Sequence, residues 1–319
     1  MAAEPTAPAN GYPLVTIGIP TYNRAHDTLP MALAAAVAQT YPNLEIVVSD
    51  NCSEDNTCEV VAGFKDRRIN YVRHPKNIGA NNNFNACVEH ARGTYLLLLH
   101  DDDLIDPDYV SACMERAQYR EDVGIIVSGM RAIDGDGNTR WEKVSDVEGA
   151  EFVDLIDAWF TNKTTMFCCN TLINTEVLRE VGGFGSKHQL FQDVLAHVQV
   201  AARLGFVDEP TIRASFRDHD QSRGSVARIS AWCEDSQDLL ETIRSLVPAQ
   251  HAEDIYARGQ RFFCRMNYGR VVAANAGRFE KLRLYREVSN TFGHAESMWR
   301  YMWQKELRPW LRSLRGRQA

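Results

Sequence analysis

The sequence predicts an α/β protein built on a mostly parallel sheet flanked by helices, with a helical C-terminal region. The first observation is that apolar, β-branched segments alternate with helix-like segments from Pro13 to about Tyr119. Such alternation is typical of parallel strands joined by right-handed crossover helices. The second observation is that helix-like patterns alone follow Arg223.

Four strands and four helices are expected in the first 120 residues. Leu14–Ile19 is an apolar, β-branched segment that ends at Pro20, and it predicts a buried strand. Similar segments predict three further strands, at residues 44–49, 69–73 and 95–99. Helices are expected at residues 28–39, 54–64, 82–91 and about 108–119. Pro30 supports the first of these, because proline is favoured in the first turn of a helix.

The pattern becomes less regular after residue 133. The sequence Asp-Gly-Asp-Gly-Asn at residues 134–138 predicts a hairpin turn before a strand near residues 141–144. Helices are then expected at 151–160 and 192–204, and strands at 166–173 and 211–216. We therefore divide the chain into a disordered leader (1–12), a globular domain (13–223) and a helical region (224–319).

Composition and charge limit the class of protein. The net charge of the 319 residues is −7, which disfavours a broad nucleic-acid-binding surface. The eight cysteines form no C-x-x-C pair, and such usage is typical of reduced thiols in the cytosol. No signal peptide is visible, and no apolar run approaches the about 20 residues that span a bilayer. These patterns predict a cytoplasmic protein.

The strongest local signal is the sequence His100-Asp101-Asp102-Asp103, directly after four leucines. Three consecutive carboxylates repel one another, so they need a cation or hydrogen-bond donors to stabilise them. Mg²⁺ or Mn²⁺ holding a diphosphate would serve, because these ions prefer carboxylate and phosphate oxygens. The alternative is a solvated acidic turn that caps the helix after it.

Other polar residues lie at expected strand or helix ends, where ligands bind in parallel α/β sheets. Asp50 could accept hydrogen bonds from a ligand or cap the following helix. The asparagines of residues 77–83 could be caps, with Gly79 providing a positive φ. Asp193 could be a general base or a helix cap. His219 could be a metal ligand or an ordinary loop histidine.

Two familiar motifs are excluded. Residues 134–138 mimic the start of a calcium-binding loop, but Thr139 replaces the required Gly and Ser145 the required Glu. No G-x-G-x-x-G follows the first strand, which disfavours a dinucleotide-binding dehydrogenase.

Taken together, three segments resemble the family 2 glycosyltransferases, which are inverting enzymes of the GT-A fold. They are Val15–Arg24, Gln39–Asp50 and Gly93–Asp103, and the resemblance extends from about Pro13 to Arg223. It implies that residues 13–105 form a nucleotide-sugar half and residues 106–223 an acceptor half.

The resemblance also implies roles for single residues. Those expected to line the nucleoside pocket are Thr21, Tyr22, Arg24 and Asp50, with Asn77 and Gly79 closing its side. Asp101 would face the ribose, Asp102 would bind the metal, and Asp103 would orient that ligand or contact the acceptor. Asp193 matches the general base, and His219 matches a histidine near the metal and diphosphate. The chain departs from the family at His100 and Gln192, where the family usually has Asp and Glu.

The implied function is transfer of a sugar from a UDP- or dTDP-sugar to a hydroxyl acceptor, with inversion and with Mn²⁺ or Mg²⁺. The acceptor could be a polysaccharide, a small molecule or a lipid carrier. One alternative is a nucleotidyltransferase of related fold, although no glycine-rich basic loop follows the first strand. Another is an inactive nucleotide-sugar-binding protein, against which Asp193 argues.

The tail from Ser297 to Ala319 is rich in tryptophan and arginine. Its aromatic and basic residues are Trp299, Trp303, Trp310, Arg300, Lys305, Arg308, Arg312, Arg315 and Arg317. Such a helix could lie on an anionic membrane as a peripheral contact. The alternative, which the sequence favours, is a helix packed on the protein or in a homodimer interface.

Overall fold

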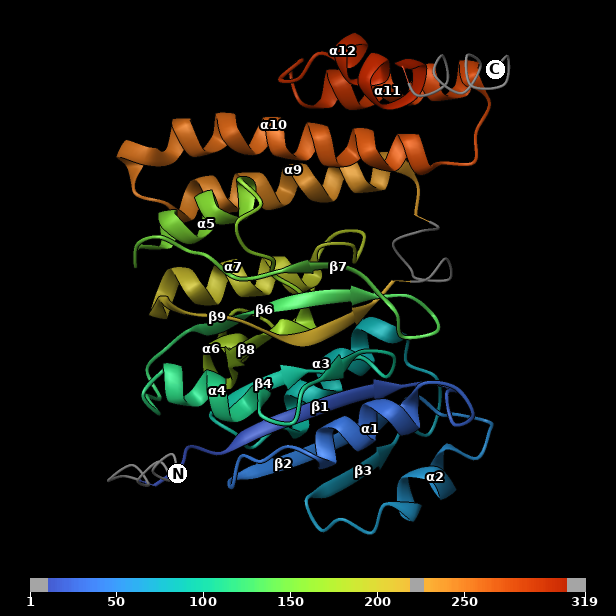
Figure 1. Cartoon of the computed structure of the whole chain (residues 1–319), viewed down its shortest axis with the longest axis vertical. Helices are drawn as coiled ribbons and strands as arrows, with labels where there is room; N and C mark the ends of the chain where they lie inside the picture. Colours follow the sequence, from blue (N-terminus) through green and yellow to red (C-terminus); the bar gives the residue numbers. More distant parts are fainter. Residues whose placement is uncertain (1–10, 219–226, 309–319) are drawn as a thin grey trace, which may run out of the picture. The chain divides into compact units, whose positions relative to one another are not determined.

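The computed structural model describes residues 11–218 and 227–308, which form two compact units (Figure 1). The first unit contains residues 11–185 and 192–218, and the second contains residues 186–191 and 227–308. The predicted boundary at residues 223 and 224 lies outside the described residues. Within the predicted leader, Tyr12 packs edge-on against Tyr41 and Tyr119, with ring centroids 5.7 and 5.4 Å away.

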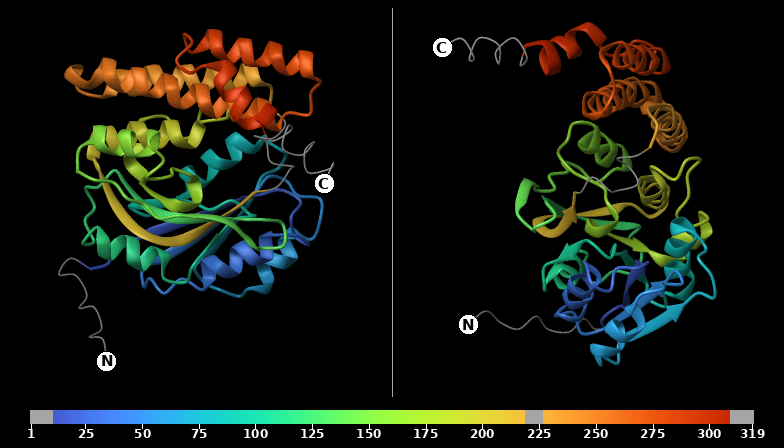
Figure 2. Two further views of the ribbon diagram at one scale, coloured as in Figure 1. Left: turned by 45° about the horizontal axis from the view of Figure 1, so that its top comes forward. Right: turned by 90° about the vertical axis from the view of Figure 1, so that its right-hand side faces the viewer.

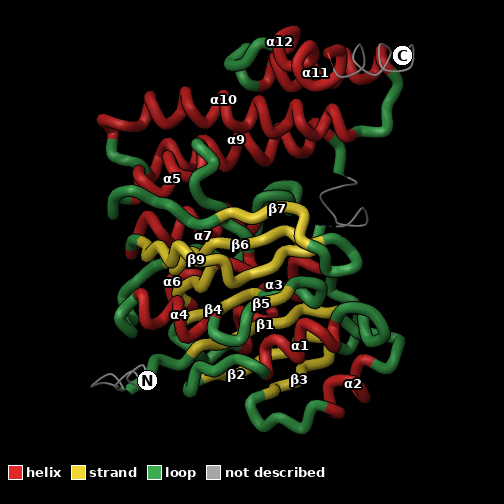
Figure 3. The backbone as a smooth tube through the Cα atoms, viewed as in Figure 1, coloured by secondary structure: helices red, strands yellow, loops and turns green. Residues whose placement is uncertain are grey.

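The first half of the sheet is parallel, as the sequence predicts. Its strands run in the order β3 (Ile69–Arg73), β2 (Leu44–Asp50), β1 (Val15–Thr21) and β4 (Tyr95–Leu98) (Figure 3). Every residue of β1, β2 and β4 is buried, which explains why these strands are nearly continuous apolar runs. The connecting helices are α1 (Leu29–Val37), α2 (Thr57–Gly63) and α3 (Ala80–His90).

The second half of the sheet is mixed. β8 (Thr171–Asn174) is antiparallel to β4 and to β6 (Ile125–Ile133), and β6 is parallel to β9 (Phe206–Arg217). β9 is antiparallel to the short strand β5 (Leu104–Ile105), while β7 (Thr139–Lys143) forms the predicted hairpin with β6. The flanking elements are α4 (Tyr109–Arg116), α5 (Phe152–Phe160), the 3₁₀ turn η1 (Cys168–Asn170), α6 (Thr175–Glu180) and α7 (Gln192–Leu204).

Four elements differ from the sequence-based expectation. β9 starts five residues early, because a register shift at Ser128 and Gly129 of β6 lets the strand pass Pro210. The expected strand at 166–173 is partly the turn η1, since the Asn170 side chain bonds backbone groups of Phe167, Ser128 and Thr165. β5 and α6 were not expected, because a two-residue strand and a six-residue helix carry little periodicity.

The second unit is helical, as predicted. It contains α9 (Ile229–Leu246), α10 (Ala249–Ala273), α11 (Arg278–Thr291), α12 (Met298–Met302) and the π-helical turn η2 (Trp303–Leu307). α9 and α10 lie side by side (Figure 2). Residues 186–191, which the sequence placed in the globular domain, belong here because the buried Asp235 accepts hydrogen bonds from Ser186, His188 and Leu190. Within residues 11–218 and 227–308, every helix is too short or too polar to cross a bilayer.

A buried carboxylate joins the parallel strands at the edge opposite their carboxyl ends. Glu45 accepts hydrogen bonds from the Thr16 hydroxyl at 2.6 Å and from the backbone N–H of Arg92 at 2.6 Å. Burial raises the pKa of Glu45, but these bonds and the Arg92 guanidinium outweigh it and lower the pKa. The next residue, Gly93, donates its N–H to Thr16 at 2.9 Å, so the two backbones lie very close together.

We expect Gly93→Ala to destabilise the first unit. A Cβ atom at Gly93 would lie 2.6 Å from the backbone nitrogen of Thr16, which cannot move without disturbing β1. Overpacking of this kind costs about 1–3 kcal/mol in the free energy of unfolding. Urea denaturation measures that loss. Gly63→Ala is the matched control, because its Cβ would meet no atom within 4 Å. Equal stability of the two variants would contradict the prediction.

Candidate functional site

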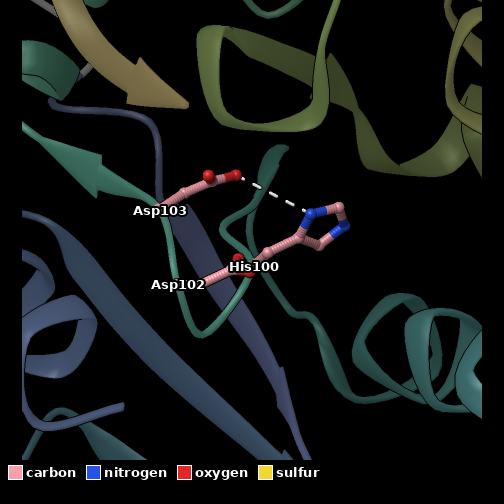
Figure 4. A group of neighbouring side chains, drawn as sticks. All are labelled: His100, Asp102 and Asp103. Carbon is pink, nitrogen blue, oxygen red and sulfur yellow. Dashed lines mark ion pairs between the residues drawn. The ribbon is translucent and has the colours of Figure 1, made fainter. Parts of the chain in front are cut away.

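A turn rich in carboxylates follows β4 at the carboxyl edge of the sheet. Ligand atoms of His100, Asp102 and Asp103 lie within 4.8 Å of one another, and such a set could hold a metal ion. Figure 4 shows the imidazole of His100 turned toward Asp103, with 3.7 Å between Nδ1 and the carboxylate. The ring of His100 also stacks on Phe84 of α3 at 4.9 Å. Carboxylate oxygens suit Mn²⁺ and Mg²⁺, and a neutral imidazole is a common metal ligand, so this set fits the predicted ion.

Burial sets the protonation of this turn. It raises the pKa of Asp101 to about 7, although the nearby Thr21 hydroxyl and Arg24 guanidinium act in the opposite direction. Burial also raises the pKa of Asp103 well above its usual value, and the charge of Asp102 adds to the effect. The pKa of His100 is lowered by burial, which favours the neutral imidazole that binds metals. The turn therefore favours a neutralising cation.

The residues after β1 lie beside this turn. The Arg24 guanidinium interacts with the charges of Asp101 and Asp102, and it forms an ion pair with Asp27 at 2.6 Å. Thr21 is buried at the end of β1, whereas the Tyr22 side chain is 41% exposed. The polar segment predicted after the first strand thus reaches the carboxylate turn, and Tyr22 presents an aromatic surface to solvent.

Asp50 ends β2 and is fully buried. The strand register places Asp50 between Thr21 of β1 and Arg73 of β3. Its carboxylate accepts hydrogen bonds from the backbone N–H of Ser53 at 2.8 Å and from the Tyr71 hydroxyl at 2.5 Å. The Arg73 Nε atom lies 3.5 Å from the same carboxylate. Asp50 therefore does bind the turn after its strand, and its predicted contact with a nucleobase stays a prediction.

Sequence reasoning assigned no role in the site to Tyr71 or Arg73, although both lie at the end of the third strand. The available signal was their position, since both precede the carboxyl end of a parallel strand. Burial and the Asp50 carboxylate raise the pKa of Tyr71, so its hydroxyl remains a hydrogen-bond donor. Sequence reasoning also assigned no metal role to His100, although histidine is a common metal ligand.

The loop between β3 and α3 lies beside the end of β2 and is held there by the side chain that directly follows this strand. The Asn51 side chain holds it, donating to the Asn77 side chain at 3.0 Å and accepting from the backbone N–H of Ile78 at 2.8 Å. Gly79 adopts φ +84°, as the positive-φ interpretation predicts, and its N–H donates to Asn77 at 2.9 Å. Asn77 and Gly79 are both exposed, so they are available to a ligand.

Asp193 lies in the first turn of α7 and is partly buried. Burial raises the pKa of its carboxyl to about 6, and the backbone N–H groups of Asp193 and Val194 oppose this shift. Burial raises the pKa of the Cys168 thiol, and the charges of Asp193 and Asp103 add to this shift, so both carboxyls lie within electrostatic range of the same thiol. The carboxylate turn and Asp193 therefore lie near one another in the first unit. His219 lies outside the described residues.

Comparisons with known proteins identify the family of this chain. The sequence profile described as Glycosyl transferase family 2 matches residues 16–182. The succinoglycan biosynthesis protein ExoO of Rhizobium meliloti is 34% identical over 127 residues, which cover 40% of this chain and 36% of that protein. Chondroitin synthase of Escherichia coli is 31% identical over 135 residues, which cover 40% of this chain and 18% of that protein. The matched regions thus span about a third or less of these relatives.

Solved structures share the fold at low sequence identity. S. aureus TarS 1–349 in complex with UDP-GlcNAc has a TM-score of 0.66 at 15% identity, covering 88% of this chain and 81% of that one. The mannosyltransferase PcManGT of Pyrobaculum calidifontis, in complex with GDP-Man and Mn²⁺, has a TM-score of 0.53 at 18% identity, covering 92% and 88%. The sheet topology and these matches confirm the predicted GT-A fold.

We predict that Asp102→Ala removes metal-dependent binding of UDP. Loss of this carboxylate leaves the cluster with His100 and the buried Asp103 alone. Calorimetric titration with UDP, with and without Mn²⁺, measures the effect. Asp122→Ala is the control, because Asp122 is an exposed partner of Arg120. Unchanged affinity for UDP in the presence of Mn²⁺ would show that Asp102 does not bind the metal.

Proposed function

The chain belongs to glycosyltransferase family 2, and we propose that it transfers a sugar from a nucleoside-diphosphate sugar to a hydroxyl acceptor. The observation that carries this proposal is that the carboxylate turn and Asp193, two acidic sites in different environments, lie near one another in the first unit. The carboxylate turn can bind a cation, and Asp193 has a carboxyl pKa raised to about 6. Pairs of groups whose surroundings give them different tasks are typical of enzyme active sites.

The donor side would be formed by the ends of β1 to β4. In this proposal Asp50 accepts a hydrogen bond from the ring N–H of a uracil or thymine base, and Asp101 faces the ribose. Tyr22 and Arg24 line the same pocket, and Asn77 and Gly79 close its side. The complexes of TarS with UDP-GlcNAc and of PcManGT with GDP-Man support a nucleotide-sugar donor, and the TarS complex alone supports a uracil base. A UDP- or dTDP-sugar fits this proposal, because uracil and thymine both offer a ring N–H from which the Asp50 carboxylate could accept a hydrogen bond.

The divalent ion would be held by Asp102, with His100 and Asp103 as further ligand candidates and with His219 as predicted from the sequence. When bound, Mn²⁺ or Mg²⁺ neutralises the charge of the diphosphate. Arg24 lies near the same carboxylates and would orient the phosphates through its planar guanidinium. Burial of Asp103 and partial burial of Asp101 strengthen the electrostatic contacts of this turn.

Asp193 is the proposed general base. Its carboxylate removes the proton from the acceptor hydroxyl as that oxygen attacks the anomeric carbon of the sugar. A new bond forms between the acceptor oxygen and the anomeric carbon, while the bond from this carbon to the diphosphate oxygen breaks. The nucleoside diphosphate leaves from the opposite face, so the configuration inverts. A base whose pKa is about 6 is deprotonated at neutral pH and can accept this proton.

The acceptor is proposed to be a carbohydrate. ExoO and chondroitin synthase, two relatives of the first unit, are named for polysaccharides. A relative from Escherichia coli, 36% identical over 90 residues, is named for glucosyl transfer to a diphosphoundecaprenol-linked sugar. Those residues cover 28% of this chain and 36% of that protein, so they support the class of acceptor and not its identity.

We predict that Asp193→Asn abolishes transfer and leaves donor binding nearly intact. The amide cannot accept the proton, whereas it conserves the shape of the carboxylate. Wild-type kcat/KM should fall about tenfold per pH unit below pH 6, because protonated Asp193 is inactive. Product analysis separates the alternatives. Release of pyrophosphate would indicate a nucleotidyltransferase, and donor binding without turnover would indicate an inactive binding protein. Normal turnover with weak donor binding would contradict the assigned role.

The second unit suggests where the enzyme works. Trp299 and Trp303 are 62% and 51% exposed. Tyr301 between them packs on Tyr268, with 5.1 Å between ring centroids. Each tryptophan is two positions from Tyr301, about 200° around a helix, so both lie on the outward face. Residues 278–319 contain ten Lys or Arg and four Asp or Glu, a net charge of +6 in a chain of −7. This combination supports peripheral contact with an anionic membrane.

We expect the double variant Trp299→Ala, Trp303→Ala to lose sedimentation with vesicles that contain anionic phospholipid. Neutral phosphatidylcholine vesicles should bind the wild type weakly, because the basic residues then have no partner charge. Trp141→Ala is the control, since Trp141 is a similarly exposed tryptophan on β7 of the first unit. Vesicle binding of the double variant equal to that of the wild type would contradict the proposal. A wild-type dimer that the double variant dissociates would also contradict it, because these tryptophans would then lie in a dimer interface.

A further inference from the structure

Arg217 is the last residue of β9, and its side chain joins two turns of the first unit. It is buried, with 5% of its surface exposed. Its backbone N–H donates to the Asp103 carboxylate at 2.9 Å, and its Nε atom donates to the backbone carbonyl of Asp102 at 2.9 Å. Its Nη1 atom donates to the carbonyls of Asp134 and Gly135 at 2.8 and 2.9 Å. One residue therefore binds both the carboxylate turn and the β6–β7 hairpin.

Strand pairing explains why Arg217 reaches both turns. β9 is antiparallel to β5, with Ser215 opposite Leu104, and β5 directly follows the carboxylate turn. On its other side β9 is parallel to β6, with Arg217 opposite Ile133, and the hairpin directly follows β6. The end of β9 thus lies between two segments that are about 30 residues apart in the chain. The planar guanidinium has donors on several sides, which a lysine lacks.

The hairpin is shaped to meet this guanidinium. The Asp134 carboxylate accepts hydrogen bonds from the backbone N–H groups of Asp136 and Asn138, at 3.0 and 2.9 Å. The carbonyl of Asp134 also accepts from Gly137 at 3.1 Å, which closes the turn. The residues that mimic a calcium-binding loop therefore order a tight turn whose first two carbonyls point to Arg217.

We propose that Arg217 is a positioning residue that fixes the carboxylates of Asp102 and Asp103 for a divalent cation before the cation binds. The inference rests on the proposed metal site. The carboxylates of this turn repel one another, so without a restraint the turn would relax and separate them. A guanidinium bonded to the Asp102 carbonyl, and an N–H bonded to Asp103, oppose that relaxation. The hairpin holds the guanidinium in place from the other side.

The test compares Arg217→Lys and Arg217→Gln with the wild type. Mn²⁺ affinity of the UDP-loaded protein, measured by calorimetry, should fall about 10–100-fold in Arg217→Gln, because partners that orient metal ligands have effects of this size. Arg217→Lys should keep part of the affinity, since its ammonium group still donates hydrogen bonds but lacks the planar fork of the guanidinium. The Mn²⁺ concentration for half-maximal activity should rise while kcat at saturating Mn²⁺ changes little. Metal-free UDP binding should not change.

Arg140→Gln is the matched control. Arg140 joins the same hairpin to the same end of β9 through an exposed ion pair with Asp218 at 2.9 Å, and it touches no residue of the carboxylate turn through this contact. Its Mn²⁺ affinity should equal that of the wild type. Circular dichroism and thermal unfolding without metal identify any variant that is misfolded.

The outcomes separate this inference from the proposed function. A wild type that shows no Mn²⁺-dependent UDP binding would overturn the metal site itself. A wild type that binds Mn²⁺, together with an Arg217→Gln variant of equal affinity, would overturn the role of Arg217 alone. If the Arg217 variants do not fold, Asp134→Ala replaces them, because it loosens the hairpin and keeps Arg217. A smaller loss of Mn²⁺ affinity is expected there, and unchanged affinity would overturn the link to the hairpin.

Discussion

The repulsion among carboxylates at one edge of the sheet is the constraint on which the rest of this site depends. Asp101, Asp102 and Asp103 are consecutive, and the charges of Asp103 and Asp193 both act on the Cys168 thiol. Burial raises the pKa of the Asp101, Asp103 and Asp193 carboxyls. A set of this kind is stable only with positive charge or donors around it. Arg24 and Arg217 provide part of this stabilisation, and the proposed divalent cation would provide the remainder.

The two halves of the sheet contribute differently. The parallel strands β1, β2 and β3 align Thr21, Asp50 and Arg73 by register, so the proposed donor side follows from a regular pattern. In the mixed half, β9 pairs with β5 and β6, segments far from it in the chain, and α7 carries Asp193 in its first turn. β4 belongs to both halves, since it is parallel to β1 and antiparallel to β8. The carboxylate turn that follows β4 therefore lies where the two halves meet.

Sequence patterns predicted the parts of the fold that arise from regular neighbours in the chain. The first four strands, the three helices between them and the β6–β7 hairpin all carry periodic or turn signals, and the structure confirms them. β5 escaped prediction because two residues have no period, and the early part of β9 was hidden by Pro210. In the site, the sequence predicted that Asp102 binds a cation. It gave no reason to expect that Tyr71 donates to Asp50 or that Cys168 lies near Asp193.

The sequence by itself determined which chemical groups stand at the carboxyl ends of the strands, because a strand and the residue after it are neighbours in the chain. The tertiary structure alone decided which of those groups touch. Asp103 meets the N–H of Arg217, 114 residues away, since β9 pairs with β5. Asp50 meets Tyr71 across a strand boundary, since β2 pairs with β3. Such contacts depend on strand pairing between distant segments, and no local pattern of residues specifies that pairing.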